Sequence, residues 1–217
     1  MIDGVIFDMD GLMFDTERVW ATLWEPALAT LGLSYKEGLD VAARGTAGDT
    51  MRAVLRRFYG ESCDTDAIME ALHAQAEIAF QAPPPKKPGL DELIAWLEAQ
   101  HIPMAVASSS RMASIRHHLD GWGLTHYFKV IVSGEQFTSS KPDPEIFLTA
   151  AKALGTAPSE TLVLEDSYNG VRAGAAGHFV TVMVPDMAPA DDEMRRLYTA
   201  ECKDLHEVKQ MLETGRL

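Results

Sequence analysis

The chain has 217 residues, of which 47% are hydrophobic and 24% charged, as in ordinary soluble globular proteins. Its 32 acidic and 19 basic residues give a net charge of −13, which repels nucleic acid and anionic membranes, so we expect neither as a partner. Cys63 and Cys202 suggest neither a disulfide framework nor a zinc motif, and no signal peptide or membrane-length apolar run is visible, so we expect a cytoplasmic protein.

The first predicted strand covers Val5 to Phe7 and leads directly into Asp8 and Asp10. Residues 16 to 82 contain no convincing strand, and their apolar residues recur at helical spacing, which predicts a small helical domain inserted after this strand. The proline-rich segment 83–89 is suited to a domain boundary. We therefore expect a core made of residues 1–15 and 83–217, with a helical cap domain over residues 16–82.

The rest of the chain alternates strands with helices. Four short apolar runs read as buried strands: Met104 to Ala107, Val130 to Val132, Leu162 to Leu164 and Val180 to Val184. Helical patterns lie between them, including one from Pro144 to Leu154 with Asp143 as its expected N-cap. This alternation predicts an α/β fold, with a Rossmann-like parallel sheet core and an inserted all-helical cap.

Polar residues follow several of the predicted strands. In chain order they are Asp8, Asp10, Ser108, Lys141, Glu165 and Asp166. Because parallel strands end at one edge of the sheet, we expect these residues to share a ligand site there. The carboxylates would repel one another more strongly than Lys141 can offset, so either some stay protonated or a divalent cation binds. Oxygen ligands without clustered His or Cys favour a hard ion, and Mg²⁺ commonly bridges carboxylates and a substrate phosphate.

The same segments resemble the motifs of a known enzyme superfamily. Asp8-Met9-Asp10-Gly11, Ser108, Lys141-Pro142-Asp143-Pro144 and Glu165-Asp166-Ser167 are similar, in order and position, to the four motifs of the haloacid dehalogenase-like hydrolases. The likeness covers nearly the whole chain. It extends to a helical cap inserted directly after the first motif, as in the branch that contains phosphoglycolate phosphatase and β-phosphoglucomutase.

This resemblance implies a role for each motif. Asp8 would attack phosphorus and form an aspartyl phosphate, and Asp10 would act as general acid and then general base. Mg²⁺ would be held by Asp8, the backbone carbonyl of Asp10 and Asp166, with Glu165 as a further ligand or a supporting group. Ser108, Lys141 and the hydroxyl-rich helix start at Ser109 would bind the phosphoryl oxygens.

Related enzymes that are not phosphatases remain as alternatives. Asp10 disfavours a dehalogenase, because a phosphate ester needs a proton donor for its leaving group and a halide does not. β-Phosphoglucomutases carry a His and a cap Arg where this chain has Trp20 and Gly48, so we favour a phosphatase over a mutase. A non-catalytic binding module on the same fold is the alternative of another class.

The expected substrate is a small phosphorylated metabolite, such as a sugar phosphate, that would fit beneath a helical cap. Within the predicted cap, Trp20 and Arg44 are our candidates for contacts with substrate. We expect the protein to act as a monomer.

Overall fold

The computed structural model describes residues 2–44, 46 and 48–217. They divide into two compact units, Met1–Asp15 with Pro85–Leu217 and Thr16–Pro84. We call the first the core unit and the second the helical unit. The chain re-enters the core unit at Pro85, whereas the sequence analysis placed this return at residue 83.

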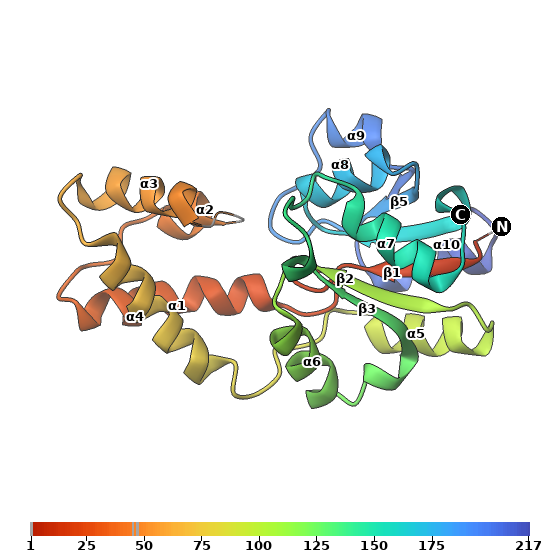
Figure 1. The fold of residues 1–217 in the computed structure, drawn as a ribbon, viewed down its shortest axis with the longest axis horizontal. Helices are drawn as coiled ribbons and strands as arrows, with labels where there is room; N and C mark the ends of the chain where they lie inside the picture. Colours follow the sequence, from red (N-terminus) through yellow and green to blue (C-terminus); the bar gives the residue numbers. More distant parts are fainter. Residues whose placement is uncertain (1, 45, 47) are drawn as a thin grey trace. The chain divides into compact units, whose positions relative to one another are not determined.

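The core unit contains a six-stranded parallel sheet in the order β3-β2-β1-β4-β5-β6 (Figure 1). Its strands are β1 (Gly4–Phe7), β2 (Met104–Ser108), β3 (Phe128–Ser133), β4 (Thr161–Glu165), β5 (Val180–Met183) and β6 (Ala200–Glu201). The predicted Rossmann-like α/β fold is confirmed. The chain runs outward from β1 to β3 and then returns to the other side of β1, so the strand order reverses between β1 and β4. Open sheets of this kind bind ligands at such a reversal.

Helices cover both faces of the sheet, which explains why its central strands are continuous apolar runs. The helices of this unit are α5 (Leu90–Ala99), α6 (Met112–Gly121), α7 (Glu145–Leu154), α8 (Tyr168–Ala176), α9 (Met194–Leu197) and α10 (Leu205–Glu213). Val5 and Phe7 of β1 enter one hydrophobic cluster, with residues of α5, α6 and α10, and Ile6 enters the other, with residues of α7 and α8. Three 3-10 turns, η1 (Thr125–Tyr127), η2 (Gly134–Gln136) and η3 (Pro158–Glu160), complete it.

The expected start of α7 is wrong by one residue. Pro144 holds the N-cap position, where we had expected Asp143, and the helix begins at Glu145. Asp143 still accepts a hydrogen bond, through Oδ1, from the backbone N of Glu145 at 2.9 Å. The carboxylate therefore satisfies a free amide of the first turn from one position further out.

The helical unit contains α1 (Thr16–Thr30), α2 (Leu39–Ala43), α3 (Gly48–Tyr59) and α4 (Thr65–Ala79). Its hydrophobic cluster includes Leu28, Leu39, Leu55 and Ile68, so each helix contributes at least one fully buried side chain. Within the described part of this unit no strand is present. The unit therefore has a small core of its own.

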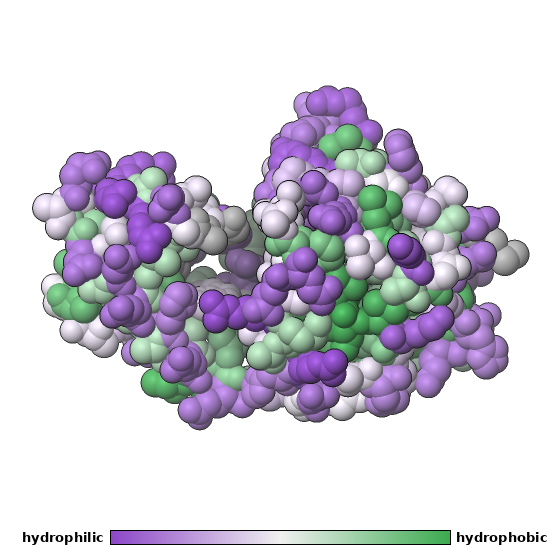
Figure 2. All heavy atoms as spheres, in the orientation of Figure 1, coloured by the Kyte–Doolittle hydropathy of each residue, from purple (hydrophilic) through white to green (hydrophobic). Residues whose placement is uncertain are grey.

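Figure 2 shows polar and charged side chains over most of the visible surface of both units, with a hydrophobic area over β3. Val130 and Ile131 are only half-buried in β3, which lies at one edge of the sheet. Among the described residues, no helix has the length and hydrophobicity that crossing a bilayer requires.

Candidate active site

Three carboxylates converge at the carboxyl edge of the sheet, next to the point where the strand order reverses. Asp8 follows β1, Glu165 ends β4 and Asp166 follows it, and one oxygen of each lies within 4.8 Å of the others. Asp8 is 7% exposed, Glu165 is fully buried and Asp166 is half-buried. Buried anions this close require compensating positive charge. The all-oxygen donor set fits a hard divalent cation.

Lys141 supplies part of that charge. Its Nζ lies 2.5 Å from Asp8 Oδ1 and 2.6 Å from Glu165 Oε1, and it also donates to the carbonyl of Ala107 at 3.2 Å. The ammonium lies 4.7 Å from the centre of the buried Phe147 ring, a cation–π distance. Burial alone would lower the pKa of Lys141, but Asp8 and Glu165 raise it above its usual value. The lysine is therefore charged at neutral pH.

One lysine does not balance the cluster. The pKa of Asp8 is raised by burial and by the neighbouring Glu165 and Asp10, against the lowering effect of Lys141. The pKa of Asp166 is raised by burial and then by Glu165 and Asp8. A dication bound at these oxygens would act in the opposite direction and favour the ionised forms of both groups.

Glu165 has hydrogen-bond partners at both of its oxygens. Oε1 accepts from Lys141. Oε2 accepts from the backbone N of Asp166 at 3.1 Å, and from the N and Oγ of Ser167 at 3.1 and 2.9 Å. Ser167 is in turn the N-cap of α8 and accepts from the N of Gly170 at 3.0 Å. Glu165 therefore fixes both the lysine and the turn that carries Asp166.

Asp10 is oriented by hydroxyl groups from the loop after β2. Its Oδ2 accepts from Ser110 Oγ at 2.7 Å and from Ser108 Oγ at 3.2 Å. Ser108 Oγ also accepts from the backbone N of Ser110 at 3.0 Å, and Ser133 Oγ donates to the Ser110 carbonyl at 2.7 Å. This network holds one carboxylate oxygen of Asp10 in place.

The structure thus brings together the core residues selected from the sequence, with one addition and one difference. They lie at one edge of the sheet in two sets, Asp8, Glu165 and Asp166 around Lys141, and Asp10 with Ser108. Ser110, which we had not selected, contacts Asp10. Ser109, which we had selected, is exposed and lies outside this hydrogen-bonded set. The sequence did hold a signal for Ser110, because it stands two residues after Ser108 and alternates with Ser109.

The predicted cap residues lie in the helical unit. Trp20 of α1 is half-buried, and its ring centroid is 5.4 Å from that of Phe80. Arg44 Nε lies 3.8 Å from Glu17 Oε2, and both side chains are partly exposed. Their roles toward substrate stay predictions.

Gly11 allows Asp166 to approach the loop after β1. It has φ +85°, and a Cβ at this position would lie 2.2 Å from Asp166 Oδ2. We expect Gly11→Ala to reduce the affinity for divalent cations at least tenfold, because Asp166 must move, and to lower the free energy of unfolding by about 2 kcal/mol. Calorimetric cation titration and urea unfolding measure these two effects.

Gly123 provides the matched control. It has φ +67°, but a Cβ added to it would meet no heavy atom within 4 Å, so Gly123→Ala introduces the backbone strain without the displaced carboxylate. We expect this variant to lose about 1 kcal/mol of stability and to keep its cation affinity. Equal cation affinities in the two variants would contradict the assignment of Asp166 as a cation ligand.

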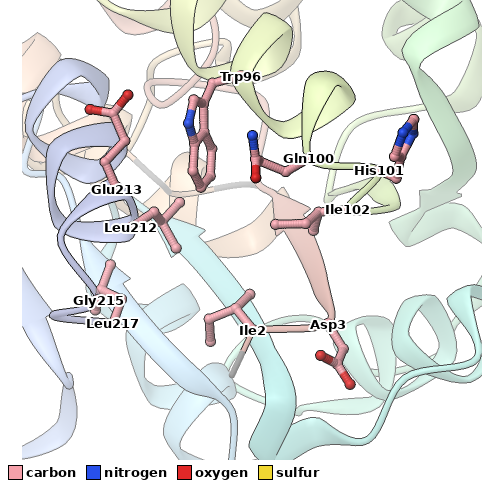
Figure 3. A pocket seen from close by; sticks show the side chains of 10 residues that line it. All are labelled: Ile2, Asp3, Trp96, Gln100, His101, Ile102, Leu212, Glu213, Gly215 and Leu217. Carbon is pink, nitrogen blue, oxygen red and sulfur yellow. The ribbon is translucent and has the colours of Figure 1, made fainter.

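A cavity of about 750 Å³ lies at the opposite edge of the sheet (Figure 3). It lies between Trp96 of α5 and Leu212 of α10, near Asp3 and Ile102, which precede β1 and β2. Of its two acidic residues, Asp3 and Glu213, the second is paired with Lys209 at 2.6 Å. The residues that line this cavity form no cluster of interacting titratable groups, so the capacity for chemistry resides in the carboxylate–lysine cluster.

Known proteins resemble this chain over most of its length. Residues 5–184 match the family model described as haloacid dehalogenase-like hydrolase. Hexitol phosphatase B of Escherichia coli strain K12 is 29% identical, over 92% of this chain and 90% of that protein. Fructose-1-phosphate phosphatase YqaB of the same strain is 30% identical, over 80% and 91%. A HAD family hydrolase from Deinococcus radiodurans R1, solved with bound phosphate and sodium, has a TM-score of 0.82 at 25% identity and covers 100% of this chain and 97% of that one.

Proposed function

The chain belongs to the haloacid dehalogenase-like hydrolases, and on that premise we propose that it is a magnesium-dependent phosphatase of small phosphomonoester metabolites. The observation that carries this proposal is the contact of Lys141 with Asp8 and Glu165 beside Asp166. It places a buried carboxylate, a fixed cation and a metal-compatible oxygen set within one small volume. A phosphoryl group needs this combination, because the carboxylate nucleophile and the phosphate are both anions.

In the proposed reaction, a carboxylate oxygen of Asp8 attacks phosphorus and the bond from phosphorus to the ester oxygen breaks. Asp10, oriented by Ser108 and Ser110, gives its proton to the departing oxygen. The same carboxylate then takes a proton from the water that attacks the aspartyl phosphate, so phosphate is released and Asp8 is restored. Lys141 and Ser108 donate to the phosphoryl oxygens.

The residues that would hold Mg²⁺ are Asp8, Asp166 and the backbone carbonyl of Asp10. When bound, the ion supplies positive charge that screens the nucleophile from the phosphate. Glu165 is assigned a supporting role instead, because Lys141, Asp166 and Ser167 already donate to its two oxygens. The sequence left both roles open for Glu165, and these hydrogen bonds favour the supporting one.

The substrate class is proposed from relatives and from the helical unit. The relatives named for hexitol phosphates and fructose 1-phosphate support a phosphorylated sugar or polyol. We assign the helical unit, residues 16–84, as a cap that admits a small metabolite, with Trp20 and Arg44 as candidate contacts with its carbon skeleton and hydroxyl groups.

Metal removal tests the proposed activity. We expect hydrolysis of p-nitrophenyl phosphate to fall at least a hundredfold after treatment with EDTA and to return on addition of Mg²⁺, but not of Na⁺. Phosphate release from a panel of sugar and polyol phosphates, ranked by kcat/KM, then identifies the substrate class. Turnover unaffected by EDTA would refute the metal requirement.

The panel also separates the phosphatase from a mutase. With β-glucose 1-phosphate and a glucose bisphosphate primer, we expect free phosphate to form faster than glucose 6-phosphate. The reverse order would replace a phosphatase with a phosphosugar mutase.

A further inference from the structure

A second buried ion pair lies at the same sheet edge as the proposed site. Lys87, in the segment that returns to the core unit, places Nζ 2.6 Å from Asp186 Oδ1 and 3.8 Å from Asp15 Oδ1. The Lys87 side chain is 15% exposed and that of Asp186 is 1% exposed. A pair this deeply buried is not an ordinary surface salt bridge, and loss of either partner would leave a charge with little access to water.

The backbone around Lys87 ties the pair to the loop that carries the nucleophile. The N of Lys87 donates to the carbonyl of Met13 at 2.9 Å, and the N of Asp15 donates to the carbonyl of Pro85 at 2.8 Å. The segment before α5 is therefore bound directly to the segment after Asp10. Lys87 holds a fixed position relative to the catalytic loop.

Asp186 lies on the metal side of the site. It lies three residues after the end of β5, in the loop that leaves the same edge of the sheet as Asp8 after β1 and Asp166 after β4. Strand β5 pairs with β4 so that Met183 lies opposite Glu165, and the N of Val184 donates to the carbonyl of Glu165 at 2.7 Å. The segment that leads to Asp186 therefore runs beside the segment that leads to Asp166, a proposed metal ligand, and Lys87 pairs a positive charge with Asp186 there.

We propose that Lys87 and Asp186 are positioning residues that set the net charge beside Asp166, so that the site binds both a divalent cation and a phosphate anion. The inference rests on the proposed function. Added negative charge near Asp166 strengthens cation binding and weakens phosphate binding, and added positive charge does the reverse. With a neutral Lys87–Asp186 pair, the site binds both the divalent cation and the phosphate strongly enough for catalysis.

Substitutions within the pair therefore have opposite effects on two ligands. Calorimetry with Mg²⁺ alone, and with inorganic phosphate at saturating Mg²⁺, measures each affinity without turnover. We expect Asp186→Asn to weaken Mg²⁺ binding and strengthen phosphate binding by about three- to tenfold each, and Lys87→Met to do the opposite. In Lys87→Met/Asp186→Asn, which restores a neutral pair, we expect both affinities within about twofold of the unsubstituted protein.

Two controls separate this from a general effect of charge or a loss of structure. Lys209→Met removes one positive charge from the distant pair with Glu213 on α10, and we expect both affinities to stay within about twofold. Lys87→Arg keeps the charge, and we expect it to resemble the unsubstituted protein even where Lys87→Met is less stable in urea.

The outcomes distinguish this inference from the proposed function. An unsubstituted protein that binds neither Mg²⁺ nor phosphate overturns both. An unsubstituted protein that binds both ions, with single variants that weaken both affinities together or change neither, overturns the positioning role alone. If the double variant stays as impaired as the single variants, the pair has a purely structural role, and the proposed positioning role is again overturned.

Discussion

Replacing Asp8 by Asn is expected to lower kcat by on the order of 10⁴-fold or more while the fold stays intact. An amide oxygen has nearly the size of the carboxylate oxygen that it replaces but is a far weaker nucleophile. The folded state tolerates the exchange, because burial already disfavours the charged form of Asp8 and raises its pKa. Lys141 also keeps its contact with Glu165 at 2.6 Å. We therefore expect the free energy of unfolding to change by less than about 1 kcal/mol.

Asp3→Asn is the matched control, because Asp3 precedes the same strand, is exposed and lies at its other end. We expect it to keep full activity. Mass spectrometry of acid-quenched enzyme should detect a phosphoryl adduct on the peptide that contains Asp8 in both the unsubstituted protein and this control, and none in Asp8→Asn. Retention of more than a tenth of the turnover by Asp8→Asn would rule out covalent catalysis by this residue.

The core of the site could be predicted because its residues follow buried strands. Runs such as Val5–Phe7 and Leu162–Leu164 are apolar throughout, since helices cover both faces of the sheet, and such runs are conspicuous in a sequence. A parallel sheet then places the residues after each run at one edge, whatever the details of packing. Asp8 and Glu165 therefore needed no knowledge of side-chain contacts to be placed near each other.

Features that depend on distant or very short segments were not predicted. Strand β6 has only the two residues Ala200–Glu201, too few for a periodic pattern. The Lys87–Asp186 pair joins positions 99 apart in the chain, and nothing local to either residue indicates its partner. Asp186 itself could have been predicted as a residue of this sheet edge, because it stands two residues after the predicted strand Val180 to Val184.

The different roles that we propose for Glu165 and Asp166 also depend on the structure. The sequence places them side by side after one strand, where either could be a metal ligand. Only the three-dimensional contacts show that Glu165 is occupied by Lys141 and by the turn at Ser167. Side-chain direction and hydrogen-bond partners, which spacing alone does not determine, separate the two carboxylates.

Lys141→Met is expected to lower both stability and activity. Methionine keeps much of the length of the side chain, but Asp8 and Glu165 lose the ammonium that lies 2.5 and 2.6 Å from them. Removal of one partner from a buried ion pair costs about 3 kcal/mol or more, because the remaining charge has little access to water. We expect a loss of this size in urea unfolding at neutral pH without Mg²⁺, and a decrease in kcat of about 10²–10⁴-fold at saturating Mg²⁺. Lys129→Met is the control. Lys129 is exposed, and among the described residues its Nζ contacts only the Leu154 carbonyl, at 3.2 Å. We expect this substitution to change neither the free energy of unfolding nor kcat appreciably.

The pH dependence of the Lys141→Met variant provides a sharper test than its stability at one pH. In the unsubstituted protein, burial raises the pKa of Asp8 and Lys141 opposes that shift, so loss of the lysine raises this pKa further. A carboxyl group whose pKa is higher in the folded than in the unfolded state contributes stability at low pH, and this contribution is lost as pH rises through the folded-state pKa. The stability deficit of Lys141→Met relative to the unsubstituted protein should therefore shrink as pH falls from 8 toward 5. A deficit that is constant across this range would mean that Lys141 stabilises the core unit by packing, for example against Phe147, and that its charge is not what holds the carboxylates together.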